Sequence, residues 1–517
     1  MKIVDKFMVL MNLTVFPNFK LMKRTIFYIL GFVFVLSSCT KLDETVYDSI
    51  PGSAYPENEN QVANLSVDAY TKLKPFADDG GWWFLAQEVS SDEFCGPTRG
   101  ADWYDGGKWL NMHRHTWSND DEGVNRMWGS MWAGVTTCNQ VLDMLNDMAE
   151  TPAIVAKKKE VESLRALYYY YLIDNYGDVP YLTSAKNAPD LPFKAKRTDV
   201  FNHLINTLQS ALPYLKAYDN KLMFNKYTAY ALLAKLYINA EVYTGTPQWA
   251  KASQYCDSVI SGPYTLATNV KDPFVTNNEK SPELIMVIPY DENTFKGFRL
   301  HMRTLHYQQN LEFDMTVGPW NGLCIVPTFF DTYQSTDLRK AAYNMWGQRY
   351  DTKGNKILDG ETHKDLIIDP HLPKLYMQAG VETPEQIRMT GARVGKYEIK
   401  LGAKENLSND FPLFRLTDFY LMKAECEIRM GHNGDQWVNP IRLRAGVSAW
   451  TNTGLDSLLA ERGRELYVEG VRRQDLIRYG KWEQSWWEKA AHGPELRVFP
   501  IPKWATDVNS NLLLPPK

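Results

Sequence analysis

The stretch that decides the fold is residues 226–260, "KYTAYALLAKLYINAEVYTGTPQWAKASQYCDSVI". Its first half carries one apolar stripe at helical spacing, made of Ala229, Leu232, Leu233, Leu236 and Ala240. A turn over residues 244–247, "TGTP", interrupts this pattern, and a second helical pattern follows it. Because alanines on the stripe let a neighbouring helix approach closely, the stretch predicts a tightly packed helix–turn–helix pair.

Similar helical patterns occur on both sides of this pair, in residues 122–150, 153–180, 198–215, 415–431 and 455–482. Between about 262 and 410 the pattern fades into short pieces separated by Gly, Pro, Asn and Asp, of which "ELIMVIPY" (283–290) reads as a strand. We therefore predict a mainly α fold, a tetratricopeptide-like helical superhelix without a strict 34-residue period, interrupted by a long irregular, loop-rich insertion. The helical scaffold takes up about 55–261 and 411–490, and the insertion about 262–410, in a single unit.

An apolar run near the N-terminus ends abruptly in "LSSCT", residues 36–40. Only 12 largely apolar residues separate Thr25 from Leu36, whereas a membrane-spanning helix needs about 20. Basic residues precede the run and small residues follow it, as in a secretory signal. Residues 36–39 resemble the lipobox of bacterial lipoproteins, so we expect residues 1–38 to be a signal peptide, with Met22 as the more natural start, and Cys39 to be a lipid anchor.

The composition is that of a globular chain, 44% hydrophobic and 23% charged, with no second candidate span. The net charge of −4 and the absence of a basic stripe exclude a nucleic-acid partner. The five cysteines after Cys39 are scattered without a C-x-x-C pair, so we expect small buried residues and no disulfide framework or zinc site. Seven of the sixteen tryptophans fall between residues 82 and 132, which draws attention to that region.

Six segments, taken in order, resemble one family: "LRALYYYYLIDNYGDVPYL" (164–182), "AYALLAKLYINAEVYTG" (229–245), "FPLFRLTDFYLMKAECEIRMG" (411–431), "NPIRLRAGV" (439–447), "ERGRELYVEGVRRQDLIRYGKW" (461–482) and "FPIPKWATDVNSNLLLPP" (499–516). Together with the lipobox they resemble the RagB/SusD family of Bacteroidetes outer-membrane lipoproteins. This resemblance implies a protein on the cell surface that captures a glycan and passes it to a SusC-like TonB-dependent transporter, with no catalysis and no cofactor.

Two of these segments contain residues that we interpret as structural. Glu461, Glu465 and Glu469 repeat every four residues among arginines, and carboxylates in one row on one helix cannot flank a bond from two sides. We interpret them as an ion-pair network that reaches Arg415, Arg442 or Arg444 on another element. The run of four tyrosines at 168–171 is interpreted as helix packing.

The best candidate for a site is residues 88–117, which lack helical periodicity and carry five glycines and prolines between 96 and 107. Long loops in compact proteins are usually functional, and this one is rich in aromatic rings and charges, which suits the apolar faces and hydroxyl rims of sugars. The alternative is that its aromatic rings are buried and pack the loop against the helices. A second candidate loop is "VGPWNGLC" (317–324) in the insertion. The predicted glycan-binding residues are Asp92, Arg99, Asp102, Trp103, Tyr104, Trp109, Trp320, Asn321, Arg393 and Tyr397.

Other chemical motifs are weak. His113 and His115 lack a third metal ligand, so we interpret them as ordinary solvent-facing residues. The acidic stretch "SNDDEG" (118–123) suits calcium, but the acidic start of the following helix explains it equally well, and nothing indicates a structural calcium.

Two other functions remain open. One is an exported glycoside hydrolase of the helical α/α-barrel type, which would need two opposed carboxylates; Glu88, Asp92 and Glu93 are the available ones, and they cluster on one segment. The other, within the same family, is capture of peptides or glycoprotein fragments.

Overall fold

The computed structural model describes residues 59–77, 80–218 and 220–517. The predicted signal peptide and Cys39 lie outside these residues. Residues Glu59–Lys517 form one compact unit. Within the described part of the chain, no helix combines the length and the apolar character needed to cross a membrane.

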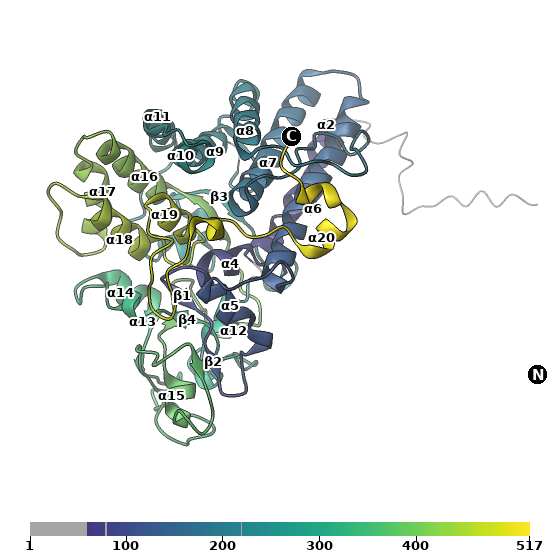
Figure 1. The fold of residues 1–517 in the computed structure, drawn as a ribbon. Helices are drawn as coiled ribbons and strands as arrows, with labels where there is room; N and C mark the ends of the chain where they lie inside the picture. The colour runs from purple at the N-terminus through teal and green to yellow at the C-terminus, as the bar shows by residue number, and fades with distance from the viewer. Residues whose placement is uncertain (1–58, 78–79, 219) are drawn as a thin grey trace, which may run out of the picture. The chain divides into compact units, whose positions relative to one another are not determined.

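Helices are the main regular elements of the unit (Figure 1). In chain order they are α6 (Glu122–Asn146), α7 (Pro152–Tyr176), α8 (Arg197–Ala211), α9 (Lys226–Ile238), α11 (Trp249–Ile260), α16 (Leu416–Arg429), α17 (Asp435–Arg444) and α18 (Leu455–Leu466). The shorter ones are α2 (Glu59–Asn64), α3 (Val67–Thr71), α4 (Trp83–Val89), α5 (Lys108–Arg114), α10 (Ala240–Thr244), α12 (Leu300–Thr304), α13 (Pro327–Phe330), α14 (Leu338–Tyr343), α15 (Pro384–Met389), α19 (Arg472–Arg478) and α20 (Lys503–Val508). The 3-10 turns are η1 (Lys74–Phe76), η2 (Asp105–Gly107), η3 (Asp272–Phe274), η4 (Asn278–Lys280), η5 (Tyr307–Leu311), η6 (Pro494–Arg497) and η7 (Ser510–Leu513).

The helices pack as consecutive neighbours: α6 on α7, α7 on α8, and α9 on α11. Helix α16, from beyond the insertion, then packs against α11, so the two halves of the scaffold interleave as predicted. The stripe on residues 226–240 is buried, and Tyr168–Tyr171 lie in the core, at most 3% exposed. Helices α6 and α7 approach each other closely at Gly134 of α6, where a Cβ would lie 2.2 Å from the ring of Tyr168 on α7. The predicted mainly α architecture is therefore confirmed.

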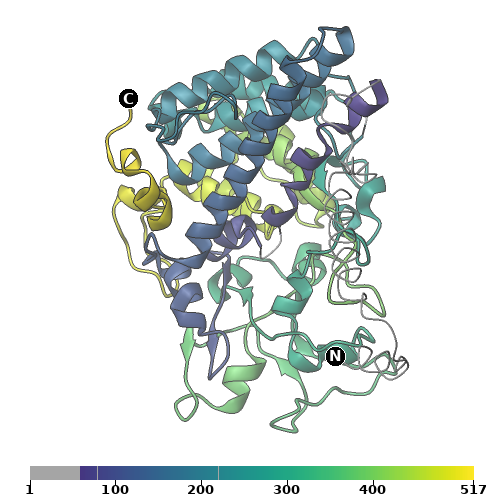
Figure 2. The same ribbon diagram turned by 90° about the vertical axis from the view of Figure 1, so that its right-hand side faces the viewer.

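The strands are short and pair two by two. They are β1 (Phe94–Cys95) with β4 (Cys324–Ile325), β2 (Thr98–Arg99) with β8 (Tyr376–Met377), β3 (Leu284–Ile288) with β10 (Phe411–Arg415), β5 (Asn344–Met345) with β9 (Arg393–Val394), and β6 (Gly347–Gln348) with β7 (Ile367–Ile368). Only β2 and β8 run parallel. The predicted strand in 283–290 is β3, and its pairing with β10 joins the beginning of the insertion to its end. Figure 2 shows the long helices gathered on one side of the unit and the loop-rich insertion on the other.

The row of glutamates on α18 and just after it lies in a buried ion-pair network, which confirms the architectural interpretation. Arg415 contacts Glu465 at 3.0 Å and Glu469 at 2.6 Å, Arg442 contacts Glu461 at 2.7 Å, and Arg444 also reaches Glu465. Burial alone would raise the pKa of Glu465, but Arg444, Arg415 and Arg339 outweigh burial and lower this pKa to about 2. The network fastens α16, α17 and α18 to one another.

Two local predictions are wrong. Residues 108–114 form helix α5, so the long loop predicted for 88–117 narrows to the segment around 96–107. His113 and His115 do not face solvent: they are 0% and 3% exposed, and their ring nitrogens bond the backbone carbonyls of Val89, Trp487 and Ser90. Burial lowers the pKa of His113, because the imidazolium would lose its hydration.

Candidate functional site

The two loops, predicted as 88–117 and 317–324, meet in the folded protein through residues 96–107 and 317–323. The indole N–H of Trp103 donates a hydrogen bond of 2.7 Å to the carbonyl oxygen of Trp320. A Cβ at Gly322 would lie 2.0 Å from the Trp103 ring, so only glycine leaves room for that ring. Trp103 and Asn321 adopt left-handed backbone conformations, with φ of 62° and 53°. Such strain in non-glycine residues is typical of functional loops.

Short strands hold the bases of both loops. Strand β1 leads into the first loop and pairs with β4, which follows the second loop directly. Strand β2 lies within the first loop and pairs with β8 of the insertion. The second loop is also bound from behind, since the N–H groups of Trp320 and Asn321 donate to the carbonyl oxygens of Met302 and Leu305. Segments far apart in sequence therefore build one rigid frame at the insertion end of the unit (Figure 1).

Two adjoining hollows open where the loops meet. The first is shallow and lined by Asp102, Trp103, Asp105, Tyr307, Pro319 and Trp320. The second is deeper, with a volume of about 310 Å³ and a lining of Arg99, Gly100, Ala101, Asp102, Tyr307, Asn321, Glu361, Ala379, Gly380, Glu382, Pro384, Ile387 and Arg388. Because Asp102 and Tyr307 line both, the two hollows form one continuous surface, which we call the loop site. It offers flat rings beside carboxylates and a guanidinium group.

Tyr307 is held in place at the centre of the loop site. Its hydroxyl donates a hydrogen bond to the carboxylate of Asp102. Partial burial, together with that carboxylate, raises the pKa of Tyr307 to about 12, so the phenol keeps its proton and remains a donor. The guanidinium of Arg388 lies 4.8 Å from the centre of the Tyr307 ring and is paired with Asp359 and Glu361 at 2.7 and 2.8 Å.

Trp320 forms the other wall of the shallow hollow. The guanidinium groups of Arg299 and Arg303 lie 5.8 and 5.5 Å from the centre of its ring. Such cations near the ring support its orientation. The rings of Trp320, Trp103 and Tyr307 therefore line one opening from three different segments of the chain.

Three of the ten predicted site residues, Asp102, Trp103 and Trp320, line this opening, and Tyr104 lies on the same loop. Tyr104 is 48% exposed, and its ring centre lies 6.0 Å from that of Tyr376. Trp109 is not on the surface, because it is 1% exposed and stacks on Trp82 with ring centres 4.9 Å apart. Trp109 therefore fits the alternative interpretation, in which a buried ring packs its loop against the helices.

The other five predicted residues, Asp92 among them, form structural contacts, although Arg99 and Asn321 also line the deeper hollow. Arg99 is 3% exposed and donates to the carbonyl oxygens of Gly322, Ile387 and Thr390 in the wall of that hollow. Asn321 and Arg393 are fully buried and bond each other at 2.7 Å. The buried hydroxyl of Tyr397 donates to the carbonyl of Val468. These groups brace the loops from within.

Asp92 lies in a different place from the loop site. Its carboxylate forms two hydrogen bonds, of 2.7 and 2.9 Å, with the guanidinium of Arg472 on α19. It lines a separate hollow with Arg472 and Trp486.

Asp105, Tyr307, Glu361, Glu382 and Arg388 are the charged or tyrosine residues of the loop site that were not among the predicted ones. Tyr307 lies in "LHYQQN" (305–310), where one aromatic ring among polar residues is the only signal. Arg388 and the glutamates lie on segments with no local feature that sets them apart. Their role comes from the pairing that places their segments beside the two loops.

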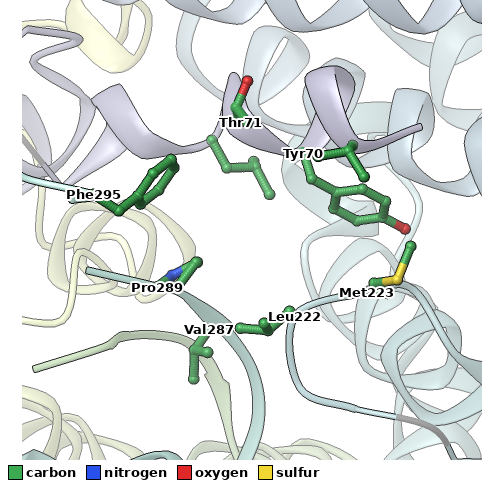
Figure 3. Close-up of a pocket in the computed structure, with 9 residues that line it drawn as sticks. Tyr70, Thr71, Leu222, Met223, Val287, Pro289 and Phe295 are labelled. Carbon is green, nitrogen blue, oxygen red and sulfur yellow. The ribbon is translucent and has the colours of Figure 1, made fainter. Parts of the chain in front are cut away.

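A different cavity, of about 280 Å³, lies between α3, the turn at 222–223 and the end of β3 (Figure 3). Its walls are almost wholly apolar, with Leu222, Met223, Val287, Pro289 and Phe295 facing one another across it. A sugar needs partners for its hydroxyl groups, so this cavity suits a glycan less well than the loop site does. Among the described residues, no group of three or more His, Cys, Asp or Glu side chains is arranged to hold a metal ion.

Comparisons with known proteins agree on one family. A family model described as the SusD family matches residues 282–511, and a SusD-like model described as starch-binding and associating with the outer membrane matches residues 86–238. The chain is 25% identical to the starch-binding protein SusD of Bacteroides thetaiotaomicron over 443 residues, which cover 77% of this chain and 78% of that protein. It is 24% identical to the SusD-like protein P25 of Formosa agariphila over 485 residues, 87% of this chain and 89% of that one.

Solved structures share the fold. A SusD superfamily protein from Parabacteroides distasonis superposes with a TM-score of 0.72 at 18% identity, covering 88% of this chain and 98% of that one. Surface glycan-binding protein A from Bacteroides thetaiotaomicron, solved with laminarihexaose, superposes with a TM-score of 0.68 at 20% identity, covering 87% and 97%. The interleaved helical scaffold and its insertion are therefore an arrangement that other proteins also adopt.

Proposed function

Because this chain belongs to the RagB/SusD family, we propose that it is a cell-surface lipoprotein that binds a glycan without cleaving it and delivers it to a TonB-dependent outer-membrane transporter. Cys39 carries the lipid anchor in the outer membrane, and the transporter is SusC-like. The ligand binds at the loop site.

The observation that carries the proposal is the meeting of Trp103, Trp320 and Tyr307 around an opening that also holds the carboxylates of Asp102 and Asp105. Sugar rings stack their C–H faces on aromatic rings and present hydroxyl groups to charged side chains at the edge. The shallow hollow supplies the rings, and the deeper hollow supplies Glu361, Glu382 and Arg388 for hydroxyl recognition.

The hydrolase alternative lacks a suitable pair of carboxylates among its own candidates. A glycosidase needs two carboxyl groups about 5–10 Å apart on opposite sides of an accessible bond. Glu88 and Glu93 are both 0% exposed, and each accepts a backbone N–H from the turn at Val468–Gly470. Asp92 is held by Arg472. These groups support the fold, so binding without cleavage is the better proposal.

A screen of the purified chain tests the function. Immobilised plant, algal and host polysaccharides, with starch and laminarin oligosaccharides among them, are probed for binding, and each hit is then incubated with the protein and assayed for new reducing ends. We expect binding of at least one glycan, with no release of reducing ends above that of the buffer. Steady release at a catalytic rate would overturn the proposal, as would retention of peptides or glycoprotein fragments with no glycan bound.

A further inference from the structure

Two thiols face each other directly behind the loop site. Cys95 of β1 and Cys324 of β4 are opposite each other in the antiparallel register, and their Sγ atoms lie 3.8 Å apart. Both side chains are 0% exposed. Residues paired in this way have Cα atoms about 4.5–5.5 Å apart, which lies within the range that a disulfide bridges. To form the bond, the sulfur atoms must move from 3.8 Å to about 2.0 Å apart.

The pair joins the bases of the two site loops. Cys95 comes immediately before the loop 96–107 that carries Trp103, and Cys324 comes immediately after the loop 317–323 that carries Trp320. A bond between the sulfur atoms would therefore tie these loops together where each leaves its strand. Glycine at 391 leaves space for this arrangement, since a Cβ there would lie 2.5 Å from the Cys324 sulfur.

The surroundings of Cys324 favour its thiolate. The Arg99 guanidinium lies 3.7 Å from the Cys324 sulfur, and its other bonds go to uncharged carbonyl oxygens. Arg393 is also buried nearby, and its Nε and Nη1 have no hydrogen-bond partner among the described residues. Burial raises the pKa of Cys324, but the hydrogen bond from Cys95 and the charges of Arg99 and Arg393 together lower it to about 7. Burial raises the pKa of Cys95, which therefore keeps its proton.

We propose that Cys95 and Cys324 form a reversible disulfide that fastens the two loops of the glycan site to each other. The proposal rests on the cell-surface location proposed above, because disulfides persist outside the reducing cytoplasm. The oxidant is a disulfide, either of a thiol–disulfide oxidoreductase or of a small molecule such as oxidised glutathione.

The chemistry is thiol–disulfide exchange in two steps. The Cys324 thiolate attacks one sulfur of the oxidant, forms a mixed disulfide and releases one thiolate. The Cys95 thiol loses its proton and attacks the Cys324 sulfur, which releases the second thiolate. The pair thus gives up two electrons and two protons, and the oxidant becomes two thiols.

Burial and charge decide how the bond behaves. Because both sulfur atoms are inaccessible in the folded chain, the bond forms and is reduced only while the loops are open, during folding or local opening. Arg99 and Arg393 stabilise the thiolate that leaves on reduction, so the bond is easier to reduce than an ordinary structural disulfide.

Peptide mapping tests the bond. The full chain is unfolded, refolded with oxidised glutathione, alkylated, digested and analysed by mass spectrometry. We expect a cross-linked peptide that contains Cys95 and Cys324, that disappears after mild reduction, and that persists in the matched control Cys138→Ser. Full alkylation of both residues after refolding, or cross-links spread equally over the buried cysteines, would overturn the proposal.

Hydrogen exchange tests the fastening. Amides of residues 96–107 and 317–323 should exchange several-fold more slowly in the oxidised protein than in the reduced protein, and the double variant Cys95→Ser/Cys324→Ser should show no such dependence. Equal exchange rates in both redox states would overturn the fastening role even if the cross-link forms. Since neither measurement uses a glycan, failure here is distinguishable from failure of the proposed function.

Discussion

The indole N–H of Trp103 bonds the carbonyl oxygen of Trp320, 217 positions away in sequence, at 2.7 Å. This bond makes the two loops parts of one surface and holds the Trp103 ring against the second loop. The orientation of Trp103, which we propose stacks on a sugar, is thus set by the backbone of the opposite loop.

The aromatic surface predicts how substitutions affect binding. Trp103→Ala and Trp320→Ala should each weaken glycan binding about tenfold or more, or ~1.4 kcal/mol, because each removes a stacking face. We expect wild-type dissociation constants from about micromolar to millimolar, since shallow, wet sites rarely bind tightly. Isothermal titration with a glycan from the screen measures both quantities.

Trp504→Ala is the matched control for these variants, because Trp504 is 51% exposed on α20, outside the loop site. It should bind as the wild type does. If circular dichroism shows that Trp103→Ala and Trp320→Ala are folded and both retain full affinity, the loop site is not where the glycan binds.

Arg472 should be structural. Arg472→Ala leaves the Asp92 carboxylate unpaired and removes a 2.8 Å bond to the carbonyl of Leu459, and should cost about 3 kcal/mol of unfolding free energy. Denaturant unfolding measures this loss. Lys503→Ala breaks an exposed ion pair with Asp507 and should leave the stability close to that of the wild type. Glycan affinity of folded Arg472→Ala should be unchanged; lost affinity at unchanged stability would contradict the structural role.

Glu88 should make the stability depend on pH. Desolvation raises the pKa of Glu88 from 4.5 to about 7, although the hydrogen bond that the carboxylate accepts from the Gly470 N–H lowers this pKa. The folded state therefore favours the protonated acid, and the stability that this group contributes is fully present below pH 4.5 and is lost as the pH rises through about 7.

Glu88→Gln keeps the acceptor for the Gly470 N–H and removes the titration of Glu88 itself. Compared with the wild type, it should therefore gain stability between pH 5 and pH 8, by on the order of 1–3 kcal/mol. Melting temperatures of both proteins over this range check the prediction. Parallel pH profiles would show that the carboxyl group is not neutral in the fold.

Cys39 should be the site of lipidation. Cys39→Ala should block normal maturation and release the chain from the outer-membrane fraction. The acyl chains of a lipoprotein bind it to the membrane, and each buried CH₂ contributes about 0.8 kcal/mol to that binding. Labelling with radioactive palmitate, followed by fractionation, measures this. Continued labelling of the variant would refute the assignment.

The transporter should co-purify. A protein attached outside the membrane cannot move a ligand inward alone, so extraction of the native chain in mild detergent should yield a complex with a TonB-dependent barrel protein. Trp103→Ala, which changes the loop site and leaves the helical scaffold in place, should still yield this complex. Repeated recovery of the lone chain from cells that express the neighbouring transporter would count against the partnership.

The helical scaffold could be predicted because its signals are local. The stripe in 226–240 repeats at helical spacing, and the tyrosine run lies inside a continuous helical pattern, so both are buried as expected. The row of glutamates predicted an ion-pair network because carboxylates every four residues share a helix face, and Arg415, Arg442 and Arg444 were found as their partners.

Tertiary structure alone decided which side chains line the loop site. Trp103 and Trp109 lie six residues apart in one aromatic loop, yet Trp82 covers Trp109, while Gly322 leaves Trp103 at the opening. Tyr307 gave no local signal, and its place beside Asp102 comes from a segment more than 200 positions away. By itself the sequence determined the helices and nominated the two loops, because periodicity and glycine content are properties of neighbouring residues. Exposure is a property of whatever else packs nearby, so only the folded chain could set it.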